Sequence, residues 1–254
     1  MRTVSKYHGA RNDFIVVDAR SEPIDDAEGF ALRWCDRTGG IGADGVLILE
    51  PSERADVAMR VINADGSEAE MCGNGVRCVA RFLDERGQRD AFEVDTRAGI
   101  IRTEIVERGP VYRVRVNMGE PRLVSVNETE PLSAIVDTGN RHIVFFREEI
   151  DRFDLEGIGE ALQDDPQYPG GINVHLIEVE GRSMLRVRHY ERGVGLTMAC
   201  GTGAVASAVA AIDRGDVTSP VFVRVPGGEL TVEWNGGGHA YMTGPAVHVF
   251  DAQI

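Results

Sequence analysis

The stretches MCGNGVRC (residues 71–78) and ACGTGAVA (residues 199–206) indicate how this chain of 254 residues is built. Each contains a Cys-Gly-x-Gly motif, and the two cysteines, at positions 72 and 200, lie 128 positions apart, about half the chain. The same offset gives further matches: Asn12 with Asn140, Ile15-Val16 with Ile143-Val144, Gly99 with Gly227, and Thr103 with Thr231. Several matches in one register predict two homologous halves, each of ordinary domain size.

The pattern of apolar residues predicts a mixed α/β (α+β) fold in both halves. Short β-branched and aromatic runs are typical of strands. We expect strands at 14–17, 46–49, 57–62, 100–106, 111–116, 143–146, 172–179, 184–190, 221–225 and 230–234. Helices are expected at 28–36, 76–85, 155–162 and 204–214.

The second and fourth of these helices follow the Cys-Gly-x-Gly motifs directly and end near Gly87 and Gly215, which suit a helix C-terminus. Each is apolar on several sides, so we expect each to be wrapped by the sheet of its own half. Turn residues at 119–121 suggest a boundary there. We therefore predict pseudosymmetric domains at 1–119 and 120–245, with a C-terminal strand, 246–254, completing the first.

Composition narrows the classes of function. The formal net charge is -14, whereas nucleic-acid binding usually needs a basic surface. No apolar run approaches the ~20 residues that span a bilayer, and the first residues resemble no signal peptide. We expect a cytoplasmic enzyme for a small metabolite, with free thiols, no bound metal, and neither nucleic acid nor membrane as a partner.

Cys72 and Cys200 each lie in the turn that opens a predicted helix. The first amides of a helix have no internal partner and the helix dipole is positive there, so such a turn binds anions and lowers the pKa of a thiol. One thiolate could remove an α-proton while one thiol delivers a proton to the opposite face. The two motifs therefore predict stereoinversion beside a carboxylate, with one acid/base group from each half.

Not every cysteine or histidine fits this scheme. Cys35 and Cys78 have no repeated context, so we expect them to be buried fillers. The histidines at 8, 175, 189, 239 and 248 are expected to be surface or packing residues.

Several longer motifs extend the pattern. They are HGARNDF (8–14), NADGSEAEMCGNGVRC (63–78), GNRH (139–142), INV (172–174) and ERGVGLTMACGTGA (191–204). In this order, and continuing to TGPAVHVF near the end, they resemble the diaminopimelate epimerase family. The resemblance implies two pseudosymmetric domains, each a small β-barrel-like sheet around a central helix. It also implies conversion of LL- to meso-diaminopimelate in lysine and cell-wall precursor synthesis, by a homodimer that uses neither pyridoxal phosphate nor metal.

The resemblance also implies roles for individual residues. Cys72 and Cys200 match the catalytic thiols, and His142 and Glu191 match residues that adjust their protonation. The amides of Gly73, Asn74, Gly201 and Thr202 match those that bind the reacting carboxylate. The side chains that match those around the substrate are Asn12, Asn63, Asn140, Asn173, Glu191 and Arg192. Arg192 would bind the distal carboxylate and Glu191 an ammonium group.

The chain departs from the family pattern at four positions. Arg11 replaces a glycine, Arg141 a proline, Leu196 a common glutamate, and Gly45 a glutamine found in some members. The two arginines keep one alternative open, a racemase of another amino acid on the same scaffold. A second alternative, from another class, is a non-catalytic protein that binds an amino acid. The first would differ only in the distal contacts, and the second would show no hydrogen exchange at the α-carbon.

Overall fold

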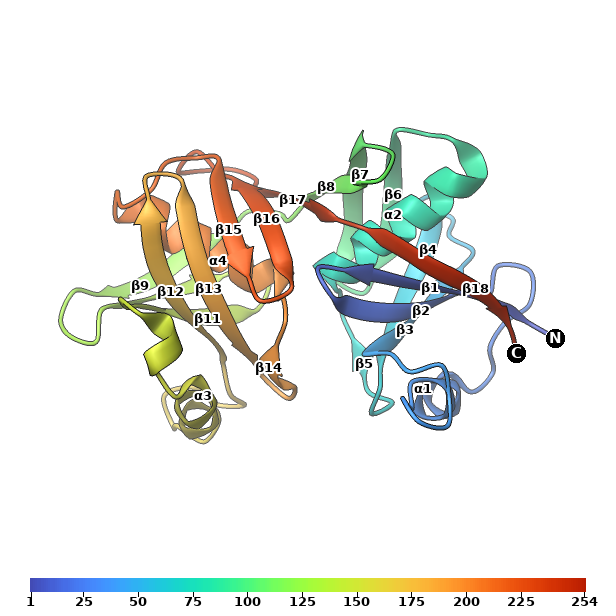
Figure 1. Cartoon of the computed structure of the whole chain (residues 1–254), viewed down its shortest axis with the longest axis horizontal. Coiled ribbons are helices and arrows are strands. Elements are labelled where there is room, and N and C mark those ends of the chain that lie inside the picture. The colour runs from blue at the N-terminus through green and yellow to red at the C-terminus, as the bar shows by residue number, and fades with distance from the viewer. The chain divides into compact units, whose positions relative to one another are not determined.

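The computed structural model describes all residues, 1–254, and divides into two compact units. The first comprises Met1–Val116 and Gly244–Ile254, and the second comprises Asn117–Thr243. In each unit, strands enclose one long helix (Figure 1). No helix is both long enough and apolar enough to cross a membrane.

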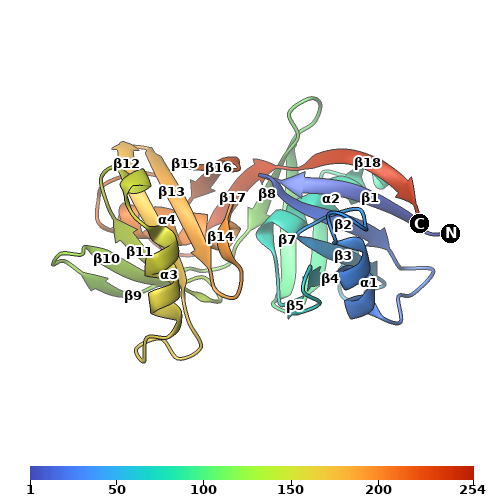
Figure 2. The same cartoon turned by 60° about the horizontal axis from the view of Figure 1, so that its bottom comes forward.

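The first unit contains the elements from both ends of the chain. Its strands are β1 (Thr3–Gly9), β2 (Asn12–Asp18), β3 (Gly45–Glu50), β4 (Val57–Asn63), β5 (Glu68–Ala69), β6 (Ala91–Thr96), β7 (Gly99–Glu107), β8 (Arg113–Asn117) and β18 (Val247–Gln253). Its helices are α1 (Ala27–Trp34) and α2 (Gly73–Gly87). Strand β18 pairs antiparallel with β1, so the two chain ends lie side by side in this unit (Figure 2).

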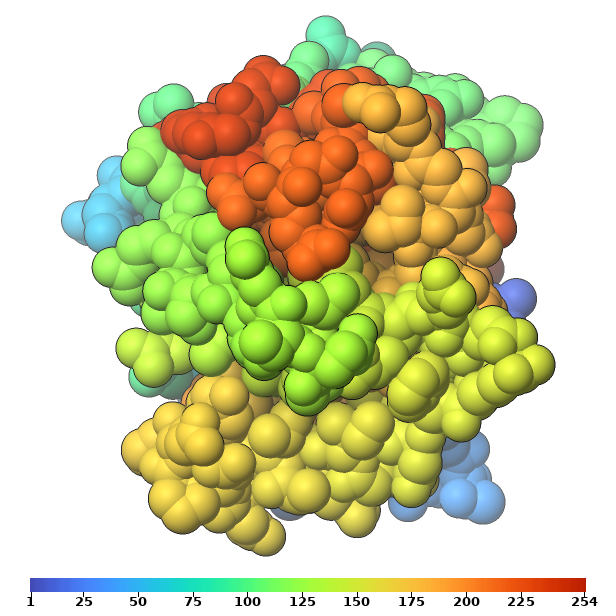
Figure 3. Space-filling model, turned by 90° about the vertical axis from the view of Figure 1, so that its left-hand side faces the viewer, coloured from blue at the N-terminus to red at the C-terminus, as the bar shows by residue number.

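The second unit is formed by the intervening elements. Its strands are β9 (Arg122–Asn127), β10 (Ser133–Asp137), β11 (Arg141–Phe146), β12 (Asn173–Gly181), β13 (Met184–Glu191), β14 (Gly195–Thr197), β15 (Val221–Val225), β16 (Gly228–Glu233) and β17 (Tyr241–Pro245). Its helices are η1 (Ile150–Arg152), α3 (Leu155–Gln163) and α4 (Gly201–Asp213). Figure 3 views one face of this unit, with green residues around β9 and yellow residues around α3 at its surface.

The two units share one strand order, which confirms the predicted duplication. In the first, the hydrogen-bonded order is β18-β1-β2-β3-β4-β6-β7-β8. In the second, it is β9-β10-β11-β12-β13-β15-β16-β17. The parallel pairs also correspond, because β2–β3 matches β11–β12 and β4–β6 matches β13–β15.

The central helices α2 and α4 form the crossovers between β4 and β6 and between β13 and β15. A parallel pair needs such a connection. Helix α4, GTGAVASAVAAID, is small and apolar on every side and is buried along most of its length. Helices α1 and α3 lie outside the strands (Figure 2) and bury one face each, with Ala31 packing beside Ile48 and Leu155 beside Leu176.

Both central helices end near the expected glycines, but several strands were missed. Gly87 is the last residue of α2, and Gln88, with φ of 49°, adopts the left-handed conformation that ends the helix. The corresponding residue after α4 is Gly215, with φ of 79°, as expected. Strands β1, β5, β6, β9, β10, β14 and β17 were not predicted, because their apolar runs are short or interrupted by polar residues.

Candidate functional site

Cys72 and Cys200 occupy the same structural position in the two units. Each is the N-cap residue of its central helix, with extended backbone angles. The Sγ atom of Cys72 accepts a hydrogen bond from the amide of Gly75 at 3.4 Å, and Sγ of Cys200 accepts one from Gly203 at 3.4 Å. A thiol that caps a helix N-terminus is stabilised in its anionic form by these amides and by the helix dipole.

The second glycine of each Cys-Gly-x-Gly turn has no room for a side chain. A Cβ atom on Gly75 would lie 2.9 Å from Cδ2 of Leu47, and one on Gly203 would lie 2.5 Å from Cε1 of His175. The side chains beneath the helix ends therefore fill the space that a larger residue would need.

Asn12 and Asn74 surround the thiol of Cys72. The Oδ1 atom of Asn12 accepts hydrogen bonds from Nδ2 of Asn74 at 3.2 Å and from the thiol of Cys72 at 3.7 Å. Nδ2 of Asn12 donates to Asp44 at 2.9 Å, which fixes the orientation of the Asn12 amide. The structure thus brings together three residues that were predicted from the sequence.

Arg77 is a buried cation next to Cys72 that the sequence analysis missed. It lies near the start of α2, is fully buried, and donates to Oδ1 of Asn74 at 2.7 Å. Burial lowers the pKa of Arg77 to about 10, while interactions with Cys78 and Cys72 act in the opposite direction. Arg77 therefore stays charged at neutral pH and favours negative charge on the thiol of Cys72.

Cys200 has the opposite environment. Burial raises the pKa of the Cys200 thiol well above its usual value, and the nearby Glu191 carboxylate raises it further. The hydroxyl of Thr202, 3.5 Å from Sγ, and the Gly203 amide act against this shift. These surroundings therefore favour the protonated form of the Cys200 thiol.

Cys35 and Cys78 are buried, as expected. Burial raises the pKa of the Cys35 thiol to about 11 and that of the Cys78 thiol to about 12. Thiols with such pKa values are poor nucleophiles and bases near neutral pH.

A chain of hydrogen-bonded histidines lies inside the second unit. Nδ1 of His142 is 2.8 Å from Nε2 of His175, and Nδ1 of His175 is 2.8 Å from Nδ1 of His189. At its outer end, Nε2 of His142 is 2.8 Å from Oδ1 of Asn140. His175 and His189 are almost completely buried, so the expectation of a surface or packing role missed their part in a polar network.

Burial is the main cause of low pKa values along this chain. It lowers the pKa of His142 to about 3 and that of His189 to about 3, and it lowers the pKa of His175 well below the usual value. Repulsion from His189 and Arg192 adds to the effect at His142. All three histidines are therefore neutral at ordinary pH.

Asn63 and Asn173 are each held by hydrogen bonds to neighbouring residues. Asn63 donates to Ser67 at 3.0 Å within the β4–β5 turn. Asn173 donates to the carbonyl of Arg141 at 3.1 Å and accepts from the amide of Arg192 at 3.1 Å. Both ends of the Asn173 amide are thus engaged in positioning the segment that carries Arg192.

Of the four departures from the family pattern, the structure explains Gly45 and shows that Arg11 is in a conformation unfavourable for arginine. Arg11 has φ of 65° in the tight turn between β1 and β2, a conformation that favours glycine. A Cβ atom on Gly45 would lie 2.7 Å from the carbonyl oxygen of Ile62, so a side chain there would require the backbone to shift. Nothing in the structure explains Arg141 or Leu196.

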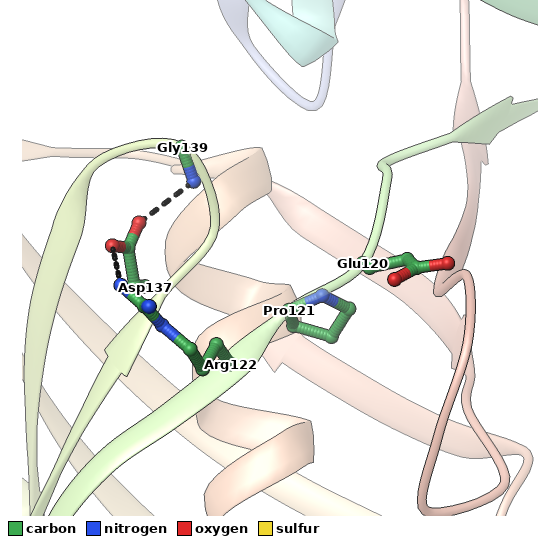
Figure 4. A pocket seen from close by; sticks show the side chains of 5 residues that line it. All are labelled: Glu120, Pro121, Arg122, Asp137 and Gly139. Carbon is green, nitrogen blue, oxygen red and sulfur yellow. Dashed lines mark hydrogen bonds and ion pairs between the residues drawn. The ribbon is translucent and has the colours of Figure 1, made fainter.

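A surface hollow of about 400 Å³ in the second unit contains none of the predicted site residues (Figure 4). Its lining consists of Glu120, Pro121, Arg122, Asp137 and Gly139. Asp137 accepts from the amide of Gly139 at 3.0 Å and pairs with Arg122 at 3.2 Å. Glu120 adds a second carboxylate to the lining, and neither cysteine of the Cys-Gly-x-Gly turns contributes to it.

Comparison with known proteins identifies the family. The family model described as diaminopimelate epimerase matches residues 4–124 and 134–249. The chain belongs to the diaminopimelate epimerase family. It is 43% identical to the diaminopimelate epimerase of Pelotomaculum thermopropionicum, over 98% of this chain and 97% of that protein. It is also 43% identical to that of Rhizorhabdus wittichii, over 98% and 93%.

Solved structures of low sequence identity share the fold. A phenazine biosynthesis protein of the PhzF family from Bacillus anthracis has a TM-score of 0.81 at 17% identity, covering 100% of this chain and 98% of that one. A hydroxyproline epimerase from Agrobacterium vitis has a TM-score of 0.72 at 17% identity, covering 100% and 90%. These similarities confirm the predicted mixed α+β fold.

Proposed function

We propose that this protein interconverts LL- and meso-diaminopimelate by moving protons at one α-carbon between two cysteine thiols. The observation that carries the proposal is that both units of a chain from this family present a thiol as the N-cap of the central helix. Two thiols can carry out this proton transfer without pyridoxal phosphate or a metal ion.

In the proposed reaction, the Cys72 thiolate takes the α-proton and the bond between the α-carbon and hydrogen breaks. The electron pair moves towards the substrate carboxylate, where helix-end amides, including those of Gly73, Asn74, Gly201 and Thr202, stabilise the developing charge. Cys200 then gives its proton to the opposite face, which leaves a Cys72 thiol and a Cys200 thiolate. The reverse reaction starts from this second state, and proton exchange with solvent restores the first.

The surroundings of the two sulfur atoms support this assignment of roles. Arg77 favours negative charge on Cys72, whereas Glu191 and burial favour the protonated form of Cys200. The difference is electrostatic and arises within each unit. We therefore assign Cys72 as the resting base and Cys200 as the resting acid for one direction of the reaction.

Recognition of the substrate is proposed to involve the residues that match the family motifs. Arg192 would bind the distal carboxylate through its guanidinium fork, and Glu191 would accept from an ammonium group. Asn12, Asn63, Asn140 and Asn173 would line the site or position its segments, and His142 would hold Asn140 and influence the thiols. By the same resemblance, we propose that the protein is cytoplasmic and forms a homodimer. Light scattering of the purified protein tests the homodimer.

A substrate panel tests the reaction. Reduced enzyme without added cofactor is incubated with LL-diaminopimelate, and in parallel with L-lysine, L-glutamate and L-proline, in deuterated water. Proton NMR is expected to show the meso isomer and deuterium at the α-carbon for diaminopimelate alone. Exchange confined to a single-centre amino acid would show a racemase of different specificity, and binding without exchange would show a protein that only binds its ligand.

A further inference from the structure

We propose that His175 and His189 are positioning residues that act through His142 to hold the amide of Asn140 in one orientation towards the substrate. The proposal rests on the function proposed above, in which Asn140 faces the substrate. It assigns a role to two buried histidines that neither the motifs nor the mechanism uses.

The position of each ring hydrogen along the chain of three histidines follows from the acceptor at its outer end. The Oδ1 atom of Asn140 can only accept, so Nε2 of His142 carries the hydrogen and Nδ1 of His142 accepts. Nε2 of His175 must then donate to that Nδ1 atom. A neutral His175 has no second hydrogen, so its Nδ1 atom accepts from Nδ1 of His189.

The inner end of the histidine chain, at His189, fits the same direction of hydrogen-bond donation. Nε2 of His189 has no partner, and in the derived arrangement it is a bare acceptor. The buried hydroxyl of Thr197 also has no partner, and Thr197 lies directly opposite His189 in the β13–β14 pair. The reverse arrangement would leave a buried N–H without an acceptor, and such orphaned donors are rare in proteins.

At the outer end, the chain determines what Asn140 can offer to a ligand. Asn140 is exposed, and its Oδ1 atom receives hydrogen bonds from His142 at 2.8 Å and from the hydroxyl of Thr138 at 3.2 Å. Its Nδ2 hydrogens therefore remain for an acceptor group of the substrate. Without the histidine chain, the amide could rotate by 180° and present its oxygen instead.

The same chain of histidines lies against the turn that carries Cys200. The His175 ring occupies the space where a Cβ atom of Gly203 would lie, and the Gly203 amide donates to Sγ of Cys200. The position of the Asn140 amide and that of the thiol are thus both set against the ring of His175. Because His175 supports both groups, we assign His175 and His189 a positioning role in the reaction.

Two variants at position 189 separate positioning from simple packing. In His189→Asn, the Nδ2 atom can replace the Nδ1–H donor, whereas His189→Leu fills the space without a donor. We expect His189→Leu to lose about tenfold in kcat/KM, the scale of leaving one buried hydrogen-bonding group, here Nδ1 of His175, without a partner, and His189→Asn to retain most of the activity. His239→Leu, at an exposed histidine of the same unit, serves as the control and should behave as wild type.

A double-mutant cycle with Asn140→Ala shows whether the effect passes through Asn140. If it does, His189→Leu will cause little further loss in an enzyme that already lacks the Asn140 amide. Full additivity, or wild-type kcat/KM for His189→Leu, would overturn the proposal. So would equal losses for His189→Asn and His189→Leu.

Nitrogen NMR of wild-type enzyme with ¹⁵N-labelled histidine gives a test that needs neither turnover nor variants. We expect the hydrogen on Nε2 in His142 and His175 but on Nδ1 in His189. Any other set of tautomers would refute the hydrogen-bond directions derived for the three histidines. If the tautomers are as expected but LL-diaminopimelate is not converted, the proposed function fails while the chain itself stands.

Discussion

Acidification from pH 7 to pH 5 is expected to destabilise the second unit through its buried histidines. A group whose pKa is lower in the folded state than in the unfolded state binds fewer protons when folded. Its contribution to the free energy of unfolding is therefore complete at high pH and falls as the pH drops below the unfolded pKa of about 6.5. For His142 and His189, the loss extends down to their folded pKa of about 3.

The magnitude follows from proton binding to the unfolded chain. Between pH 7 and pH 5, one histidine that stays neutral in the fold loses about 2 kcal/mol of stabilisation. His142 and His189 together account for about 4 kcal/mol, and His175 acts in the same direction. That sum is a large share of the stability of an ordinary domain. Paired carboxylates lose their stabilising contribution only at lower pH, since the pKa of Asp13, for example, is lowered to about 2.

Urea unfolding at several pH values measures the effect, with the free energy extrapolated to water at each. Each unit contains one tryptophan, Trp34 in the first and Trp234 in the second, so fluorescence of a Trp34→Phe variant reports the second unit alone. His189→Leu should reduce the loss between pH 7 and pH 5 by about 2 kcal/mol. His239→Leu is the control. A stability of the second unit that does not change over this range would refute the reasoning.

Three further predictions concern single positions. Arg11→Gly should raise the free energy of unfolding by about 1 kcal/mol, because glycine removes the strain at φ of 65°; a lower stability in urea unfolding would contradict this. Gly203→Ala should reduce kcat at least about tenfold, because its Cβ would collide with His175 and displace the Cys200 turn, whereas unchanged kcat would show that the turn adapts. Arg77→Met should move the rising limb of kcat/KM to higher pH by about one unit, because the cation that favours the Cys72 thiolate is lost, and an unmoved limb would exclude that role.

The duplicated framework could be predicted because its signals are local. Each Cys-Gly-x-Gly turn is followed by an apolar helix, and the common offset of 128 positions links the two halves through residue identities alone. The placement of Cys72 and Cys200 at the start of these helices followed from the same reasoning, whereas their N-cap geometry is seen only in the structure. Strands such as β9 were missed because nearly all of its residues are exposed, which leaves no alternation of apolar residues to detect.

The electrostatic part of the site could not be predicted because it depends on contacts between distant segments. His175 and His189 lie on neighbouring strands, and only the β12–β13 register places them opposite each other. Arg77 resembles an ordinary helical arginine in the sequence, and its complete burial depends on the strands around α2. Sequence motifs therefore located the thiols, while the structure was needed to distinguish their charge states.

The two-thiol mechanism is tested most directly by following LL-diaminopimelate in deuterated water with the wild-type enzyme and with Cys72→Ser and Cys200→Ser. The wild type is expected to form the meso isomer with deuterium at the inverted carbon. Both variants should fold, as circular dichroism would show, and lose conversion by at least about a thousandfold, because each face of the α-carbon needs its own acid/base group. Conversion at the wild-type rate by either folded variant would contradict the mechanism.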